Sequence, residues 1–200
     1  MGQSRCRGAA GFTMLEALVA IVILAFGVLG VANLLVKSFR FAQQSSYDVV
    51  ALQMANDMAD RMRANDAAML AKAYDNFDSN SGIPAVPAPA NLYKTGCTGA
   101  SAACALLTAA FDQGEWARQV QAALPGGRVL ICRDANAFNV TSGYDWPCTV
   151  GATTTTPLVV KIGWVSRFSD TAETQMADSR TANGIAKPQI VVVVTPGVNN

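Results

Sequence analysis

The feature that most restricts this chain is a run of twenty residues without a charged side chain, between Glu16 and Lys37. A helix of that length measures about 30 Å, which matches the hydrocarbon core of a bilayer. Fifteen of the twenty-five residues from Phe12 to Val36 are Phe, Leu, Ile or Val. Their transfer into lipid, at about −0.3 to −0.6 kcal/mol each, outweighs a cost of about 3 kcal/mol for one carboxylate near the end of the span. We therefore expect this segment to insert into a membrane.

The residues before this segment favour one orientation and argue against a cleaved secretory signal. Residues 1–11 contain Arg5 and Arg7 but no acidic residue, and basic residues before a span favour the cytoplasmic side. A secretory signal has a shorter apolar core, of about 7–15 residues, followed by a small-residue cleavage site, and no such site follows here. An uncleaved signal anchor explains insertion but not the order Gly-Phe-Thr-x-x-Glu at residues 11–16.

Residues 11–16, Gly-Phe-Thr-Met-Leu-Glu, followed at once by a long apolar run, resemble the processing site of type IV pilins and pseudopilins. The resemblance implies that a prepilin peptidase removes residues 1–11 as a leader, by cleavage between Gly11 and Phe12, and methylates the new amine of Phe12. It also implies that Glu16, the fifth mature residue, acts in assembly by pairing with the Phe12 amine of a neighbouring subunit. A carboxylate that only reaches the membrane interface is the alternative for Glu16.

The helix that begins with this segment is predicted to be long. No proline occurs before Pro84, so helix is predicted from Phe12 to about Asn65, with residues 12–36 as its membrane and assembly half. In the second half, residues 37–66, apolar residues recur every four positions, which predicts one face packed against a soluble domain. The residues of that face are Val50, Met54, Met58 and Met62, with Ala51, Ala55 and Ala59 beside them.

The segment from Gln53 to Asn65 narrows the resemblance to one group within the type IV pilins. It is similar to the equivalent stretch of minor pilins called type IV pilus modification proteins (PilV), which share a D-M-x-D-R-M-R-A-N pattern. Within it, Asp57 and Arg61 are spaced for an ion pair on one helix face. The resemblance implies a non-enzymatic subunit that joins other minor pilins to prime pilus assembly, at or near the tip. The matching residues are Asp57, Met58, Asp60, Arg61, Met62, Arg63, Ala64 and Asn65.

Five cysteines divide into Cys6 in the leader and four in the C-terminal half. An even set beyond a membrane segment predicts disulfides in an oxidising compartment. Zinc is the alternative, although the spacings do not match the close cysteine pairs of most structural zinc sites. Four cysteines allow three pairings, and we favour Cys97–Cys104 with Cys132–Cys148, because pairs close in sequence lose the least entropy on loop closure.

The remainder predicts an α+β fold, with the long N-terminal helix packed on a small antiparallel sheet, as in type IV pilins. Residues 67–127 are predicted to be a connector containing a second helix from about Ala103 to Leu124. Capping-box spacing of Asp112 and Glu115 allows a later start at Asp112. Residues 128–200 are predicted to form the sheet, with strands at 128–133, 158–166 and 189–195.

Composition restricts the function classes. The chain has no histidine and a net charge of +1, and its basic residues are scattered, so neither an enzyme nor a nucleic-acid-binding protein is expected. No metal or other cofactor is expected. The expected partners are other minor pilins, the major pilin, the prepilin peptidase and the bacterial inner membrane, with the globular domain in the periplasm and later on the pilus. A tip-exposed binding or adhesion module and a type II secretion minor pseudopilin are the alternatives.

Overall fold

The computed structural model describes residues 13–81, 83, 102–141, 143–153, 155–164 and 187–195. The chain divides into two compact units, Met1–Gln43 and Gln44–Asn200. Helix α1, Met14–Ala64, contributes its first part to the first unit and its last part to the second. The prediction of one long helix is therefore confirmed from Met14 onwards, while Phe12 lies outside the described residues.

In the first unit, α1 is apolar on all sides. One 18-residue window has a mean hydropathy of 2.7, so by length and composition this helix could cross a membrane. Its large apolar side chains are exposed, which leaves them available to lipid or to other helices. Among them are Leu18, Ile21, Val22, Leu24, Phe26, Leu29, Leu34 and Leu35.

In the second unit, the last part of α1 is amphipathic, as predicted. Met58 and Met62 are fully buried, and Val50 and Met54 pack partly buried against the same core. Ala51, Ala55 and Ala59 are buried beside them. Alanine at these positions adds little side-chain volume, so neighbouring elements can approach the helix closely.

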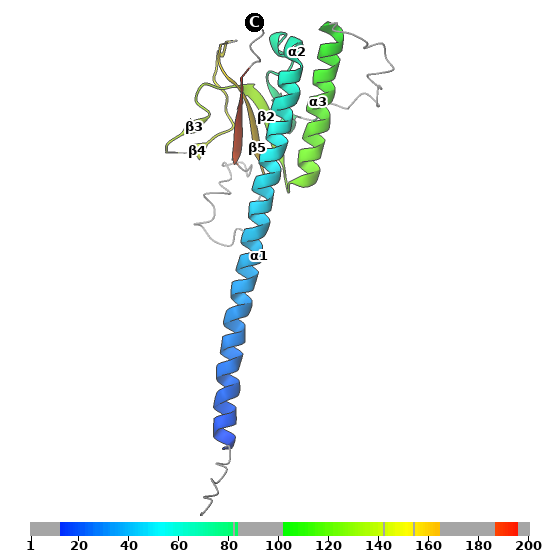
Figure 1. Ribbon diagram of the computed structural model, residues 1–200. Coiled ribbons are helices and arrows are strands. Elements are labelled where there is room, and N and C mark those ends of the chain that lie inside the picture. The colour runs from blue at the N-terminus through cyan, green and yellow to red at the C-terminus, as the bar shows by residue number, and fades with distance from the viewer. Residues whose placement is uncertain are drawn as a thin grey trace, which may run out of the picture. The chain divides into compact units, whose positions relative to one another are not determined.

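Among the described residues of this unit, two further α-helices follow, α2 at Asp66–Leu70 and α3 at Ala102–Ala123. The later start of α3 at Asp112 is wrong, because the helix runs uninterrupted through Asp112. In Figure 1 α3 lies beside the C-terminal part of α1. The helix ends before the Pro-Gly-Gly sequence, where Gly126 takes a φ of +62°, a left-handed conformation that glycine adopts without strain.

The sheet has four antiparallel strands in the order β1-β2-β5-β6. The three predicted strands are confirmed, although β5 ends at Gly163, earlier than the predicted Ser166, which lies outside the described residues. Their bounds are Arg128–Arg133 for β2, Leu158–Gly163 for β5 and Ile190–Val194 for β6. A short hairpin of β3, Phe138–Asn139, and β4, Gly143–Tyr144, lies between β2 and β5 in the chain.

The fourth strand, β1 at Phe77–Asp78, was not predicted from the sequence. It lies within the segment predicted to be a connector, residues 67–127, yet it pairs with Leu130 and Ile131 of β2. A 3₁₀ turn, η1 at Ser79–Ser81, follows it. Two residues are too few to show an alternating pattern, so only the pairing with β2 identifies this strand.

Both faces of the sheet are covered. On one face, Val160, Ile162 and Trp164 share a core with Met58 of α1 and Trp116 of α3, because alternate residues of a strand lie on the same face of the sheet. On the opposite face, Leu130, Cys132 and Val159 form a smaller core with Trp146 of the loop between β4 and β5. All six residues of β5 are consequently buried, including Lys161.

Candidate functional site

The start of α1 carries the residues that the resemblance assigns to processing and assembly. Gly11 and Phe12 lie outside the described residues. Thr13 is the N-cap of the helix: its hydroxyl oxygen accepts a hydrogen bond of 3.3 Å from the backbone N–H of Glu16. Sequence reasoning missed this cap, although Thr-x-x-Glu is the capping-box signal. Glu16 is the third residue of the helix and is exposed. At this position its carboxylate also interacts favourably with the positive end of the helix dipole.

The segment that resembles the PilV pattern lies where α1 meets α3. Arg61 forms an ion pair with Asp57 one turn earlier, at 3.0 Å, as predicted. It also reaches Asp112 of α3 at 3.3 Å. Burial pulls the pKa of Arg61 down, but the two carboxylates outweigh that effect and raise it. Burial raises the pKa of Asp112 above its ordinary value despite the nearby guanidinium.

Asn65, the last residue of that pattern, joins three elements. Its side-chain oxygen accepts a hydrogen bond from Ala68 at the start of α2, and its amide nitrogen donates to the carbonyl of Ala105 in α3 at 2.9 Å. The same amide nitrogen lies 3.2 Å from the hydroxyl of Tyr74, whose pKa burial raises to about 12. Trp116 of α3 donates its indole N–H to the carbonyl of Met54 at 2.9 Å.

The structure tests part of the predicted cysteine pairing. Cys132 and Cys148 form the predicted disulfide, so the zinc alternative is wrong for this pair. Cys104 is also disulfide-bonded, to a partner outside the described residues, and Cys97 lies there too. The predicted Cys97–Cys104 pairing therefore stays a prediction.

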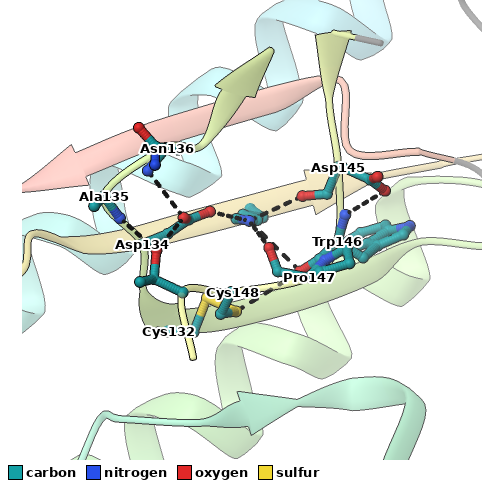
Figure 2. Close-up of polar contacts among 10 residues, drawn as sticks. Cys132, Asp134, Ala135, Asn136, Asp145, Trp146, Pro147 and Cys148 are labelled. Carbon is teal, nitrogen blue, oxygen red and sulfur yellow. Dashed lines mark hydrogen bonds and ion pairs between the residues drawn. A yellow bond between two sulfur atoms is a disulfide. The ribbon is translucent and has the colours of Figure 1, made fainter. Parts of the chain in front are cut away.

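A buried ion pair lies beside the Cys132–Cys148 disulfide (Figure 2). The Lys161 ammonium contacts Asp134 Oδ2 at 2.6 Å and the side chain of Lys161 is fully buried. Burial acts to raise the pKa of Asp134, but hydrogen bonds from Lys161, from the N–H of Asn136 and from the hydroxyl of Thr149 hold it below its ordinary value. The sequence signal was a single lysine inside the apolar run LVVKIG, because a buried cation needs a partner.

Trp146 covers the sheet next to this pair. Its ring lies 4.2 Å from the guanidinium carbon of Arg128, in a cation–π contact, while Arg128 also binds both carboxylate oxygens of Asp78 in β1. A Cβ on Gly163 would stand 2.8 Å from the Trp146 ring and 2.7 Å from the carbonyl oxygen of Lys187. Glycine at this position therefore lets the indole lie directly on β5.

These groups bind one another rather than a reactive centre. Within the described ranges, no three Cys, Asp or Glu side chains come together in a way that could hold a metal ion. The arrangement joins α1, α3 and both faces of the sheet through ion pairs, hydrogen bonds and a disulfide.

The comparisons with known proteins bear on the helix. Residues 6–32 match the model of the prokaryotic N-terminal methylation motif, which covers Gly11, Phe12 and Glu16. Among curated proteins no match is found, and among solved structures none is found either. The motif, the long apolar helix and the α+β arrangement together support a type IV pilin-like protein. Within that class, the motif is compatible with a pilin or a pseudopilin.

Proposed function

We propose that this chain is a minor type IV pilin of the PilV type, a non-enzymatic subunit that primes or modifies pilus assembly at or near the tip. The observation that carries the proposal is the methylation motif, which runs over residues 6–32 from the basic N-terminal segment into the apolar part of α1. Cleavage of a leader before such a segment leaves the segment in the mature protein. The same helix can then lie in the inner membrane and later in the helical core of a pilus.

The PilV assignment is supported by the residues that the resemblance singled out. Arg61 and Asn65 both contact α3, while Met58 and Met62 are fully buried in the core. The D-M-x-D-R-M-R-A-N pattern thus coincides with the joint between the long helix and the globular domain. A type II secretion minor pseudopilin remains the alternative that the methylation motif does not separate from a pilin.

The proposed location is the inner membrane with the globular domain in the periplasm, followed by the pilus. The Cys132–Cys148 disulfide supports an oxidising compartment for the globular domain. The proposed partners are other minor pilins, the major pilin and the prepilin peptidase. No specific nucleic acid is proposed as a ligand.

Deletion of the gene, scored for surface pili with retraction active and with retraction blocked, tests the priming role. A priming subunit speeds initiation of assembly. The deletion strain should therefore lack most surface pili when retraction is active, and it should carry many of them when retraction is blocked. Unchanged pilus number with retraction active would contradict the proposal. A secretion defect with normal pili would instead identify a pseudopilin.

One observation favours a second candidate, a tip-exposed binding module. Three apolar side chains between β2 and β5 are exposed, Phe138 at 58%, Val140 at 93% and Val150 at 98%. All three belong to the segment between these two strands, and a contiguous exposed apolar surface marks a contact site. The triple change of these residues to serine should leave pilus number unchanged but weaken adhesion if the module binds a surface. Reduced pilus number would assign the same residues to contacts between subunits.

A further inference from the structure

The ammonium of Lys161 is enclosed by oxygen atoms from one loop. Besides Asp134 Oδ2, it contacts the carbonyl oxygens of Asp145 at 2.8 Å, Pro147 at 3.0 Å and, more distantly, Trp146 at 3.5 Å. An ammonium has three protons, and the three shorter contacts account for all of them. We call these four residues, whose oxygen atoms accept from the ammonium, the lysine shell. Nothing else on β5 has a polar shell of this kind among the described residues.

The disulfide joins the two halves of the lysine shell. Asp134 follows Cys132 by two residues, and the segment from Asp145 to Pro147 immediately precedes Cys148. Figure 2 shows the disulfide beside both halves. The bond therefore closes the segment that contains every atom bound by the Lys161 ammonium.

Apart from the disulfide and the lysine shell, this segment is held by the pairing of β3 with β4 and by its packing on the sheet. Its apolar packing on the sheet consists of Trp146, Ala137 and the two bonded cysteines, against Leu130, Val159 and Val191. Two of these contacts belong to the disulfide itself. Without the bond, closing the segment of about fifteen residues becomes less favourable by a factor of roughly one hundred. The lysine shell and these contacts must together supply that difference, or the segment opens.

We propose that the Cys132–Cys148 disulfide and the burial of Lys161 form one cooperative device, in which reduction of the bond opens the lysine shell and exposes that face of the sheet. Once the shell opens, the ammonium no longer has its carbonyl partners, and a charge that stays buried without partners is costly. The reduced segment therefore moves far enough from β5 for water to hydrate Lys161. The proposal does not depend on the proposed pilus function.

Formation of the closed state is an oxidation. Two thiols, Cys132 and Cys148, lose two electrons and two protons as the S–S bond forms. The oxidant is a disulfide of the compartment in which the domain folds, and thiol–disulfide exchange reduces it to a dithiol. Closure of the lysine shell follows, because the bond brings Asp134 and the carbonyls of Asp145 and Pro147 to one side of β5.

A double-mutant cycle on the full chain in detergent tests the coupling. One change is Cys132→Ser/Cys148→Ser, which removes this bond but not that of Cys104. The other is Lys161→Met/Asp134→Asn, which removes both charges and keeps an oxygen for Asn136 and Thr149. We expect loss of the disulfide to raise the unfolding equilibrium constant about tenfold more in the wild type than in the Met/Asn background. Equal losses in both backgrounds would overturn the proposal.

A matched control and a second measurement complete the test. Arg61→Met/Asp112→Asn removes the helix ion pair by the same chemistry and should show no coupling to the disulfide. If a serine variant does not fold, equilibration of the oxidised chains with dithiothreitol replaces it. Reciprocity then requires the wild-type bond to resist reduction about tenfold better than the bond in the Met/Asn variant. Identical reduction midpoints would overturn the proposal.

Discussion

Arg61 of α1 lies 3.3 Å from Asp112 of α3, fifty-one residues further along the chain. The contact ties the end of the long helix to the globular domain at the place where the PilV-like pattern occurs. Asp112 is nearly buried, with 13% of its side chain exposed. Loss of its partner therefore leaves a poorly hydrated carboxylate.

Arg61→Met should lower the free energy of unfolding by about 1–3 kcal/mol, because Asp112 then remains largely buried without its cation. Urea denaturation of the full chain in detergent measures this change. Arg63→Met is the matched control, since Arg63 pairs with Asp60 on the exposed side of the same helix. The control should change the free energy of unfolding by no more than about 0.5 kcal/mol. Equal effects of both substitutions would contradict a special role for Arg61.

Asp134→Asn should lower the free energy of unfolding by about 3–5 kcal/mol at neutral pH, because the Lys161 ammonium loses its only charged partner in the described chain. The pKa of Asp134 is held below its ordinary value, so its stabilisation is complete above the unfolded pKa of about 3.9 and is lost as pH falls through the folded pKa. The wild type should therefore lose stability more steeply than the variant below about pH 4.

Urea midpoints between pH 2 and pH 7 measure these slopes, and Asp112→Asn provides a control of opposite sign. Burial raises the pKa of Asp112, so its protonation in the folded state partly offsets acid destabilisation. The Asp112→Asn variant should lose stability more steeply on acidification than the wild type. A shallower slope for this variant would show that the direction assigned to Asp112 is wrong.

Gly163→Ala should destabilise the domain by about 1–3 kcal/mol, as overpacking of a well-packed site does. The added methyl would stand 2.8 Å from the Trp146 ring and 2.7 Å from the Lys187 carbonyl. Thermal unfolding measures the loss. The additional change Trp146→Leu should recover part of it, because a smaller side chain removes one of the two clashes. No recovery would assign the cost to the Lys187 backbone.

Mature protein should begin at Phe12 with an N-methylated amine. The methylation motif over residues 6–32 motivates this prediction, and intact mass of the membrane-extracted chain tests it. Gly11→Ala should be processed better than a bulky replacement, because the cleavage site accommodates a small residue. An intact Met1, or a terminus after Val36, would contradict processing at this position.

Glu16→Gln and Glu16→Ala should both insert into the membrane and both fail to enter pili efficiently. Glutamine keeps the capping-box character of the third helical residue but removes the charge, so the pair of variants separates the two roles of Glu16. Quantification of the subunit in sheared pili measures incorporation. Normal incorporation of the Gln variant with loss for Ala would assign Glu16 to helix capping instead of subunit pairing.

Local patterns in the sequence were sufficient to predict the elements in which apolar residues recur at a regular spacing. The apolar run after Glu16, the four-residue repeat through Met62 and the β-branched strands are of this kind, and each was confirmed. The Cys132–Cys148 bond was also predictable, because loop closure between near neighbours loses the least entropy.

Tertiary structure alone decided the contacts that join distant segments. Strand β1 has two residues and exists only through its pairing with β2. The capping-box spacing of Asp112 allowed a later helix start, but Asp112 lies inside α3 and pairs with Arg61 of α1. For Lys161, the sequence showed a charge in an apolar strand, and only the folded loop brings Asp134 and the carbonyls to it. The energy of a buried charge depends on every oxygen within reach, and chain folding, not residue order, sets those distances.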